Sequence, residues 1–217
     1  MEDRKWDYVW TAGCSHSVKE FAPGLKSWNN RIADRLKLPC KNFALSGGSN
    51  MRITRLLERD FILEKKDDRT PLILIGCTEF TRVELYLIHQ WVGFSVSSDL
   101  GASTTLLGKI DKYLKAIYPK PAFREHAALH NMFMLKGVLD YLNYDYLVVP
   151  MFDYKEFTNH ANTNFPDFLL FDKPFMQFCR TGPYISIDEG FHYGNTAHED
   201  WAEVVYERLE KKFNVEI

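Results

Sequence analysis

The chain has 217 residues, enough to bury a sizeable core, and we expect a single domain that spans residues 1–217. Hydrophobic residues make up 46% and charged residues 26%, as in an ordinary globular protein, and the net charge of −2 excludes a global basic field for nucleic acid. No apolar run approaches the roughly 20 residues that span a bilayer. The first residues are charged and do not resemble a signal peptide, so we expect a cytoplasmic protein without a membrane span.

The first third of the chain alternates buried-strand patterns with helical ones. In chain order we expect a strand at 8–10, a helix at 28–36 ended by Pro39, a strand at 41–45, a glycine loop at 46–50 with Asn50 as a helix cap, a helix at 53–61 and a buried strand at 71–76.

The rest of the chain continues the alternation. We expect an apolar segment at 83–94 that fits either a strand or a helix, helices at 106–117 and 122–142, a strand at 144–151, an irregular aromatic stretch at 152–184 and a terminal helix at 198–213. Strand–helix alternation over one chain favours a parallel sheet with helices on both faces.

The segment from Thr11 to Ser17 is the strongest candidate for chemistry. Ser15 follows the first strand, which puts its hydroxyl at the carboxyl edge of the sheet, where open α/β sheets bind ligands. A serine hydroxyl is a weak nucleophile and needs an adjacent base. Cys14 is an alternative nucleophile, because a thiol beside a helix start has a lowered pKa. The four cysteines are scattered and form no CxxC pair, so we expect free thiols rather than disulfides or a zinc site.

Four segments, in this order, resemble the conserved blocks of the SGNH (GDSL-like) hydrolases. They are Gly13–Ser17, Asn42–Ser49, Gly76–Glu79 and Glu189–His192. The variant motifs look most like the branch found in tailed-phage genomes, which would place the protein in a host cytoplasm or a virion. The resemblance implies a flavodoxin-like three-layer α/β/α sandwich. It also implies a serine esterase without metal or cofactor, acting on small acyl esters such as O-acetyl groups on carbohydrate.

The resemblance also assigns a Ser-His-acid triad. Ser15 is the nucleophile and His192 is the base, since imidazole titrates near neutral pH. A carboxylate must orient the imidazole. Glu189 has the family's spacing of three residues before the histidine and is ranked first; Asp188, one residue earlier, could also reach it.

For the oxyanion, the resemblance assigns the backbone N–H groups of Ser15 and Gly47 and a side chain from the third block. Thr78 stands there in place of the usual asparagine, and Asn50 or His16 would have to supply a compensating donor. Losing one such donor costs on the order of 10²–10³ in rate. The altered positions therefore leave open a catalytically impaired binding module, or a virion-associated structural protein.

The remaining histidines favour ordinary roles. His198 reads as a cap or packing residue of the last helix. His126 and His130 have a spacing that can bind zinc, but a packed or solvated helix face is the favoured interpretation. The aromatic stretch 152–184 could offer a stacking surface for a sugar or an acyl chain.

Overall fold

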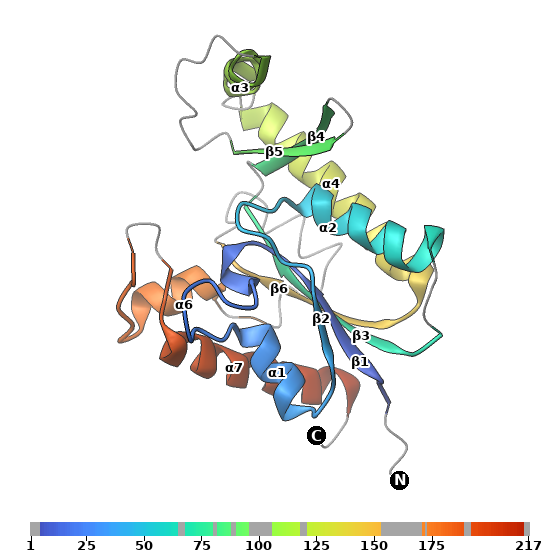
Figure 1. Cartoon of the computed structure of the whole chain (residues 1–217), viewed down its shortest axis with the longest axis vertical. Helices are drawn as coiled ribbons and strands as arrows, with labels where there is room; N and C mark the ends of the chain where they lie inside the picture. The colour runs from blue at the N-terminus through green and yellow to red at the C-terminus, as the bar shows by residue number, and fades with distance from the viewer. Residues whose placement is uncertain are drawn as a thin grey trace.

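A computed structural model describes residues 5–64, 68–79, 82–87, 90–95, 106–117, 121–152, 171, 173–188 and 192–214. Its centre is a parallel sheet of four strands in the order β2-β1-β3-β6 (Figure 1). The strands are β1 (Tyr8–Ala12), β2 (Cys40–Asn42), β3 (Pro71–Cys77) and β6 (Asp145–Pro150). The expected α/β class and parallel sheet are confirmed.

The two central strands are buried on both faces, which explains their continuous apolar sequences. Every residue of β1 and β3 is buried, and the register pairs Val9 with Leu72 and Trp10 with Ile73. Successive side chains enter opposite layers: Val9 and Leu72 belong to one core, and Trp10 and Ile73 to the other.

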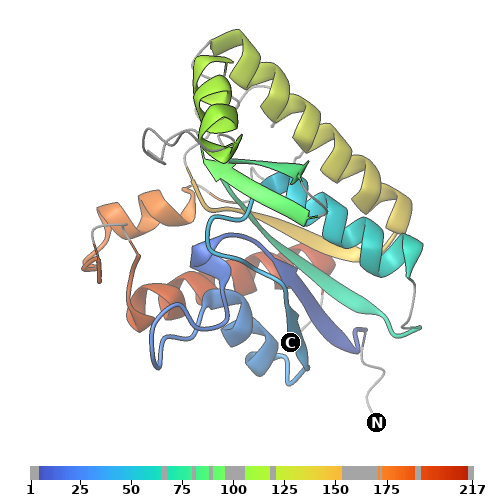
Figure 2. The same cartoon turned by 45° about the horizontal axis from the view of Figure 1, so that its top comes forward.

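Helices cover both faces of the sheet, giving three layers. Helices α1 (Trp28–Arg35) and α7 (Asn195–Phe213) lie together on one face, and the short α6 (Phe175–Thr181) adds Phe175 to the same core. Helices α2 (Asn50–Leu57) and α4 (Pro121–Leu142) lie together on the other face (Figures 1 and 2). A π-helical segment, η2 (Glu58–Leu63), continues α2.

A small substructure lies beyond the α2 side of the sheet. Strands β4 (Arg82–Leu87) and β5 (Gln90–Ser95) pair antiparallel in a separate two-stranded sheet, and α3 (Leu106–Ile117) follows them (Figure 2). The segment 83–94, which was expected to be either a strand or a helix, therefore consists of two antiparallel strands in its described residues. Buried Val83 packs against partly buried hydrophobic residues of α2 and α3, which anchors the hairpin.

Four of the predicted features differ from the structure. The cap of α2 is Ser49, whose Oγ accepts from the backbone N–H of Arg52 at 3.1 Å, and Asn50 is the first helical residue. The second strand is shorter than predicted. Beyond its end, the N–H groups of Phe43 and Leu45 still donate to backbone carbonyls at and just after the end of β1. The stretch 152–184 contains α6, and α7 starts at Asn195 rather than His198. Within the described ranges, no helix is long and apolar enough to cross a membrane.

Candidate active site

Ser15 begins a single 3-10 turn, η1 (Ser15–Ser17), directly beyond the carboxyl end of β1. The turn is anchored by Ser17. Its carbonyl accepts from the amides of Asn29 at 3.0 Å and Asn42 at 2.9 Å, and its Oγ accepts from the indole N–H of Trp28 at 3.2 Å. These buried contacts fix the backbone of the turn, so the position of Ser15 is set by the fold. Ser15 itself is 6% exposed.

The glycine loop packs directly on the end of β1. Gly47 has φ +73°, a conformation that favours glycine, in a turn closed by the Gly48 N–H donating to Leu45 O at 2.8 Å. A Cβ on Gly48 would lie 2.9 Å from the carbonyl oxygens of both Gly13 and Leu45. The close approach at Gly48 therefore packs the glycine loop against Gly13, two residues before Ser15. Within the described residues, the N–H groups of Ser15 and Gly47 donate no hydrogen bond, so both predicted oxyanion donors are unpaired.

His192 is held by Asp188 through two contacts. Asp188 Oδ2 lies 2.6 Å from His192 Nδ1, and Oδ1 accepts from the His192 backbone N–H at 3.0 Å. The His192 ring also stacks on Phe21, with centroids 3.7 Å apart. A carboxylate on Nδ1 favours the tautomer with the proton there, leaving Nε2 as the basic nitrogen. Of the two predicted acids, the structure thus pairs Asp188 with the base; Glu189 lies outside the described residues.

Among the described contacts, no hydrogen bond joins the side chains of Ser15 and His192. His16, the residue after Ser15, brings the two segments together: its ring centroid is 5.1 Å from that of His192. A catalytic hydrogen bond that is absent in a ligand-free protein can form in the substrate complex.

His16 is 3% exposed and lies between the rings of Phe152 and Phe175. Its Nδ1 is buried without a hydrogen-bond partner. Burial is the largest cause that holds the pKa of His16 well below its usual range, and repulsion from the Arg82 guanidinium acts in the same direction. His16 is therefore a neutral imidazole in the folded protein.

His198 packs as expected, stacked on Phe175 with centroids 5.0 Å apart and only 3% exposed. Burial lowers its pKa to about 3. Two of the three imidazoles at this edge are thus kept uncharged. Within the described residues no group of histidine, cysteine, aspartate or glutamate could hold a metal ion, and His130 is exposed.

Thr78 follows β3 and is fully buried. The Asn50 side chain pairs with its peptide: Oδ1 accepts from the Thr78 N–H and Nδ2 donates to the Thr78 carbonyl, each at 2.9 Å. The Thr78 Oγ1 accepts from Arg82 at 3.0 Å. Asn50 therefore positions the third block; the oxyanion roles of Asn50, Thr78 and His16 stay predictions.

Two residues of this edge were missed from the sequence, Arg82 and Phe21. Arg82 lies four residues after Thr78, which is a weak signal, and nothing near Phe21 marks it. Cys14, the alternative nucleophile, is fully buried before the turn. Burial raises the pKa of Cys40 to about 11, and the four cysteines are free thiols, as expected. Most of the aromatic stretch, residues 153–170, lies outside the described residues.

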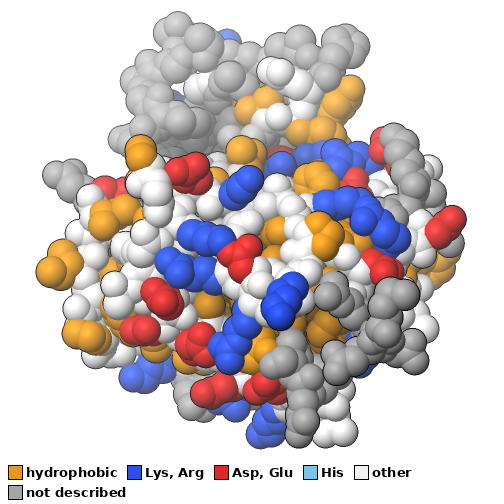
Figure 3. All heavy atoms as spheres, turned by 60° about the horizontal axis from the view of Figure 1, so that its bottom comes forward, with side chains coloured by type: hydrophobic (Ala, Val, Ile, Leu, Met, Phe, Trp, Pro, Cys, Tyr) orange, Lys and Arg blue, Asp and Glu red, His pale blue; other side chains and the backbone are white. Residues whose placement is uncertain are grey.

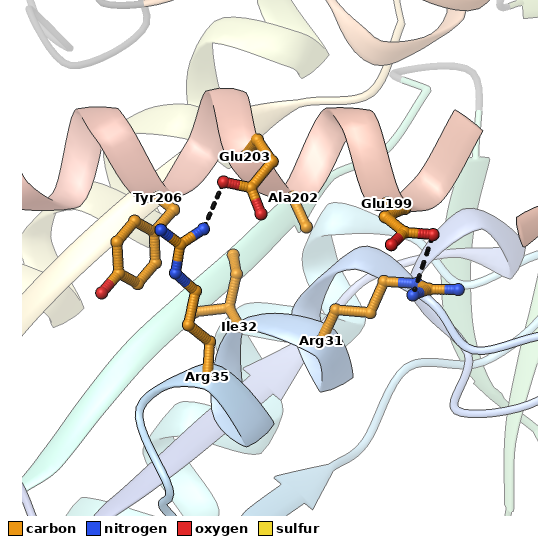
Figure 4. Close-up of a pocket in the computed structure, with 7 residues that line it drawn as sticks. All are labelled: Arg31, Ile32, Arg35, Glu199, Ala202, Glu203 and Tyr206. Atoms are coloured by element: carbon orange, nitrogen blue, oxygen red, sulfur yellow. Dashed lines mark hydrogen bonds and ion pairs between the residues drawn. The ribbon is translucent and has the colours of Figure 1, made fainter. Parts of the chain in front are cut away.

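A small pocket lies between α1 and α7, and Ser15 does not line it (Figure 4). Arg35 pairs with Glu203 and stacks on Tyr206 at 3.6 Å, and Arg31 lies 3.6 Å from Glu199. Its lining holds no serine, cysteine or histidine, so we assign it to helix docking. On the face drawn in Figure 3, acidic and basic side chains are interspersed.

Comparison with known proteins adds no family. No protein-family model matches the chain, and no curated protein is significantly similar to it. The functional argument therefore depends on the motifs and on the geometry at the carboxyl edge of the sheet.

Proposed function

We propose that the chain is a serine hydrolase of SGNH type that cleaves small acyl esters. The observation that carries the proposal is the Asp188–His192 pair beside the Ser15 turn, at the carboxyl edge of the parallel sheet. The strand order 2-1-3 followed by β6 is compatible with the flavodoxin-like sandwich of that family. The unpaired N–H groups of Ser15 and Gly47 supply the donors that acyl transfer needs.

In the proposed reaction, His192 Nε2 takes the proton of Ser15 as its Oγ attacks the ester carbonyl. Asp188, on Nδ1, stabilises the imidazolium that forms. The carbonyl π electrons move to oxygen, where the backbone N–H groups of Ser15 and Gly47 donate to the oxyanion. His192 then gives its proton to the leaving alcohol, and water releases the acid from the acyl-enzyme by the same steps. Small acyl esters, including O-acetyl groups on carbohydrate, are the proposed substrates.

A second candidate function is a binding module that keeps the fold without the chemistry. The missing hydrogen bond between Ser15 and His192 favours it, together with Thr78 at the position of the family's asparagine. It predicts ligand binding that is unaffected by Ser15→Ala.

Fluorophosphonate labelling, read by intact mass, separates the two. A hydrolase gives one adduct on Ser15, lost in Ser15→Ala and His192→Ala. Ser46→Ala is the matched control, because Ser46 is an exposed serine beside Gly47, and it should label like the wild type. Absence of an adduct on folded wild-type protein would overturn the hydrolase proposal.

A further inference from the structure

Arg82 is a cation built into the same edge of the sheet. Its Nη1 donates to Thr78 Oγ1 at 3.0 Å, and its Nε lies 3.7 Å from a carboxylate oxygen of Glu79. The guanidinium carbon is 5.5 Å from the ring centroid of Phe152, and the side chain is 15% exposed. Its buried Nε has no hydrogen-bond partner. The side chain is thus held by Thr78, Glu79 and Phe152, and its Nε is too buried to reach a ligand.

Ring contacts connect this guanidinium to the Ser15 turn. Phe152, which Arg82 faces, lies 5.5 Å from His16, and His16 lies 5.1 Å from His192. The Arg82 charge is also among the influences that lower the pKa of His16, which agrees with their proximity. Arg82 is therefore connected to the Ser15 turn through the rings of Phe152 and His16.

The charge states of the neighbouring side chains distinguish Arg82 from the other groups at this edge. His16 and His198 are neutral through burial, and Asp188 is paired with His192. A guanidinium stays protonated at any working pH. Glu79 is its ion-pair partner, but the 3.7 Å separation is too long for a hydrogen bond, and the Glu79 side chain is 34% exposed. Positive charge at Arg82 is consequently available to an anion formed nearby.

We propose that Arg82 stabilises the oxyanion of the tetrahedral intermediate, in place of the amide donor that Thr78 cannot supply. The inference rests on the proposed function. As Ser15 Oγ bonds to the carbonyl carbon, the π electron pair becomes the oxyanion, and the Ser15 proton goes to His192. Arg82 donates a hydrogen bond to that oxygen and keeps its protons throughout. Thr78 Oγ1 positions the guanidinium, which makes Thr78 a positioning residue.

The test uses full-length Arg82→Met and Arg82→Lys, with Arg35→Met as a control that removes an arginine on the far side of α1. We measure the second-order rate of fluorophosphonate labelling and the kcat and KM for p-nitrophenyl acetate, a neutral ester. We expect Arg82→Met to lower the labelling rate and kcat by about 10²–10³, the usual effect of losing one oxyanion donor, with KM nearly unchanged. Arg82→Lys should recover part of the loss, since the charge remains without the guanidinium geometry.

Several outcomes would overturn the inference. One is Arg82→Met labelling at the wild-type rate; this would leave the proposed function intact, whereas an unlabelled wild type would refute the proposed function itself. Another is an effect confined to the KM of an anionic ester such as p-nitrophenyl hemisuccinate. This result would show that Arg82 binds the negative charge of the substrate and not the oxyanion. A loss of rate matched by a lowered Tm in both Arg82 variants would make its role structural.

Discussion

The Asn50 side chain makes a contact whose loss can be predicted in magnitude. Asn50 is 1% exposed, and its amide makes two hydrogen bonds of 2.9 Å with the peptide of fully buried Thr78. Asn50→Ala removes both. A buried polar group that loses its partner costs about 1–3 kcal/mol, so we expect the free energy of unfolding to fall by about 2–4 kcal/mol. With a urea m-value of about 2–3 kcal/mol/M, the midpoint should fall by roughly 1 M.

Asn195 provides a matched control for this experiment. Its side chain also donates to a backbone carbonyl and accepts from a backbone N–H, each at 2.9 Å, and accepts a further hydrogen bond from Arg31 at 2.8 Å, but the residue is exposed. Water can replace these partners there, so Asn195→Ala should cost less than about 1 kcal/mol. Equal shifts in the two variants, at an unchanged m-value, would refute the argument that burial makes the Asn50 contact important.

Three further predictions concern the site and its pH dependence. Asp188→Asn should lower the labelling rate by as much as about 10⁴, since the imidazole loses its preferred tautomer, while Glu189→Gln stays near wild type; the reverse order would reject the pairing. Gly48→Ala, which forces a Cβ against two carbonyl oxygens, should destabilise by about 1–3 kcal/mol, whereas Gly137→Ala, where the Cβ meets open space, should not. His198 has a pKa of about 3 in the folded protein against 6.5 in the unfolded chain, so the free energy of unfolding falls as pH drops through that window, by up to ~1.4 kcal/mol per pH unit. Urea midpoints measured across this pH range should show a slope smaller by about one proton in His198→Phe. An unchanged slope would contradict the prediction.

The sheet was predictable because its central strands have the simplest pattern. Residues 71–76 are apolar without a break, and only a strand buried on both faces uses such a run at that length. The segment 83–94 has no comparable pattern. A short apolar run of this kind fits a strand of a hairpin as well as one face of a helix, so the sequence does not distinguish the two. Its anchoring through Val83 depends on helices distant in sequence, which local pattern does not reveal.

The contacts within the candidate site could not be predicted from the sequence motifs. Spacing favoured Glu189, which lies outside the described residues, whereas the carboxylate seen on His192 Nδ1 is that of Asp188, the other predicted candidate. Asn50 was expected to cap a helix, yet its amide reaches the end of another strand. Such side-chain–backbone contacts depend on where two distant segments meet, which the sequence alone does not specify.

The three clustered histidines differ in their surroundings, and the difference bears on the proposed role of His192 as a base. Three imidazoles that all protonated at one edge would repel each other, and a proton taken from Ser15 would have no preferred site. Burial prevents this at His16 and His198, whose pKa values are lowered mainly by loss of water. His192 differs by having Asp188 on Nδ1 and a ring stacked on Phe21. Of the three, His192 is thus the imidazole whose Nδ1 contacts a carboxylate, which is the arrangement that its proposed role as a general base requires.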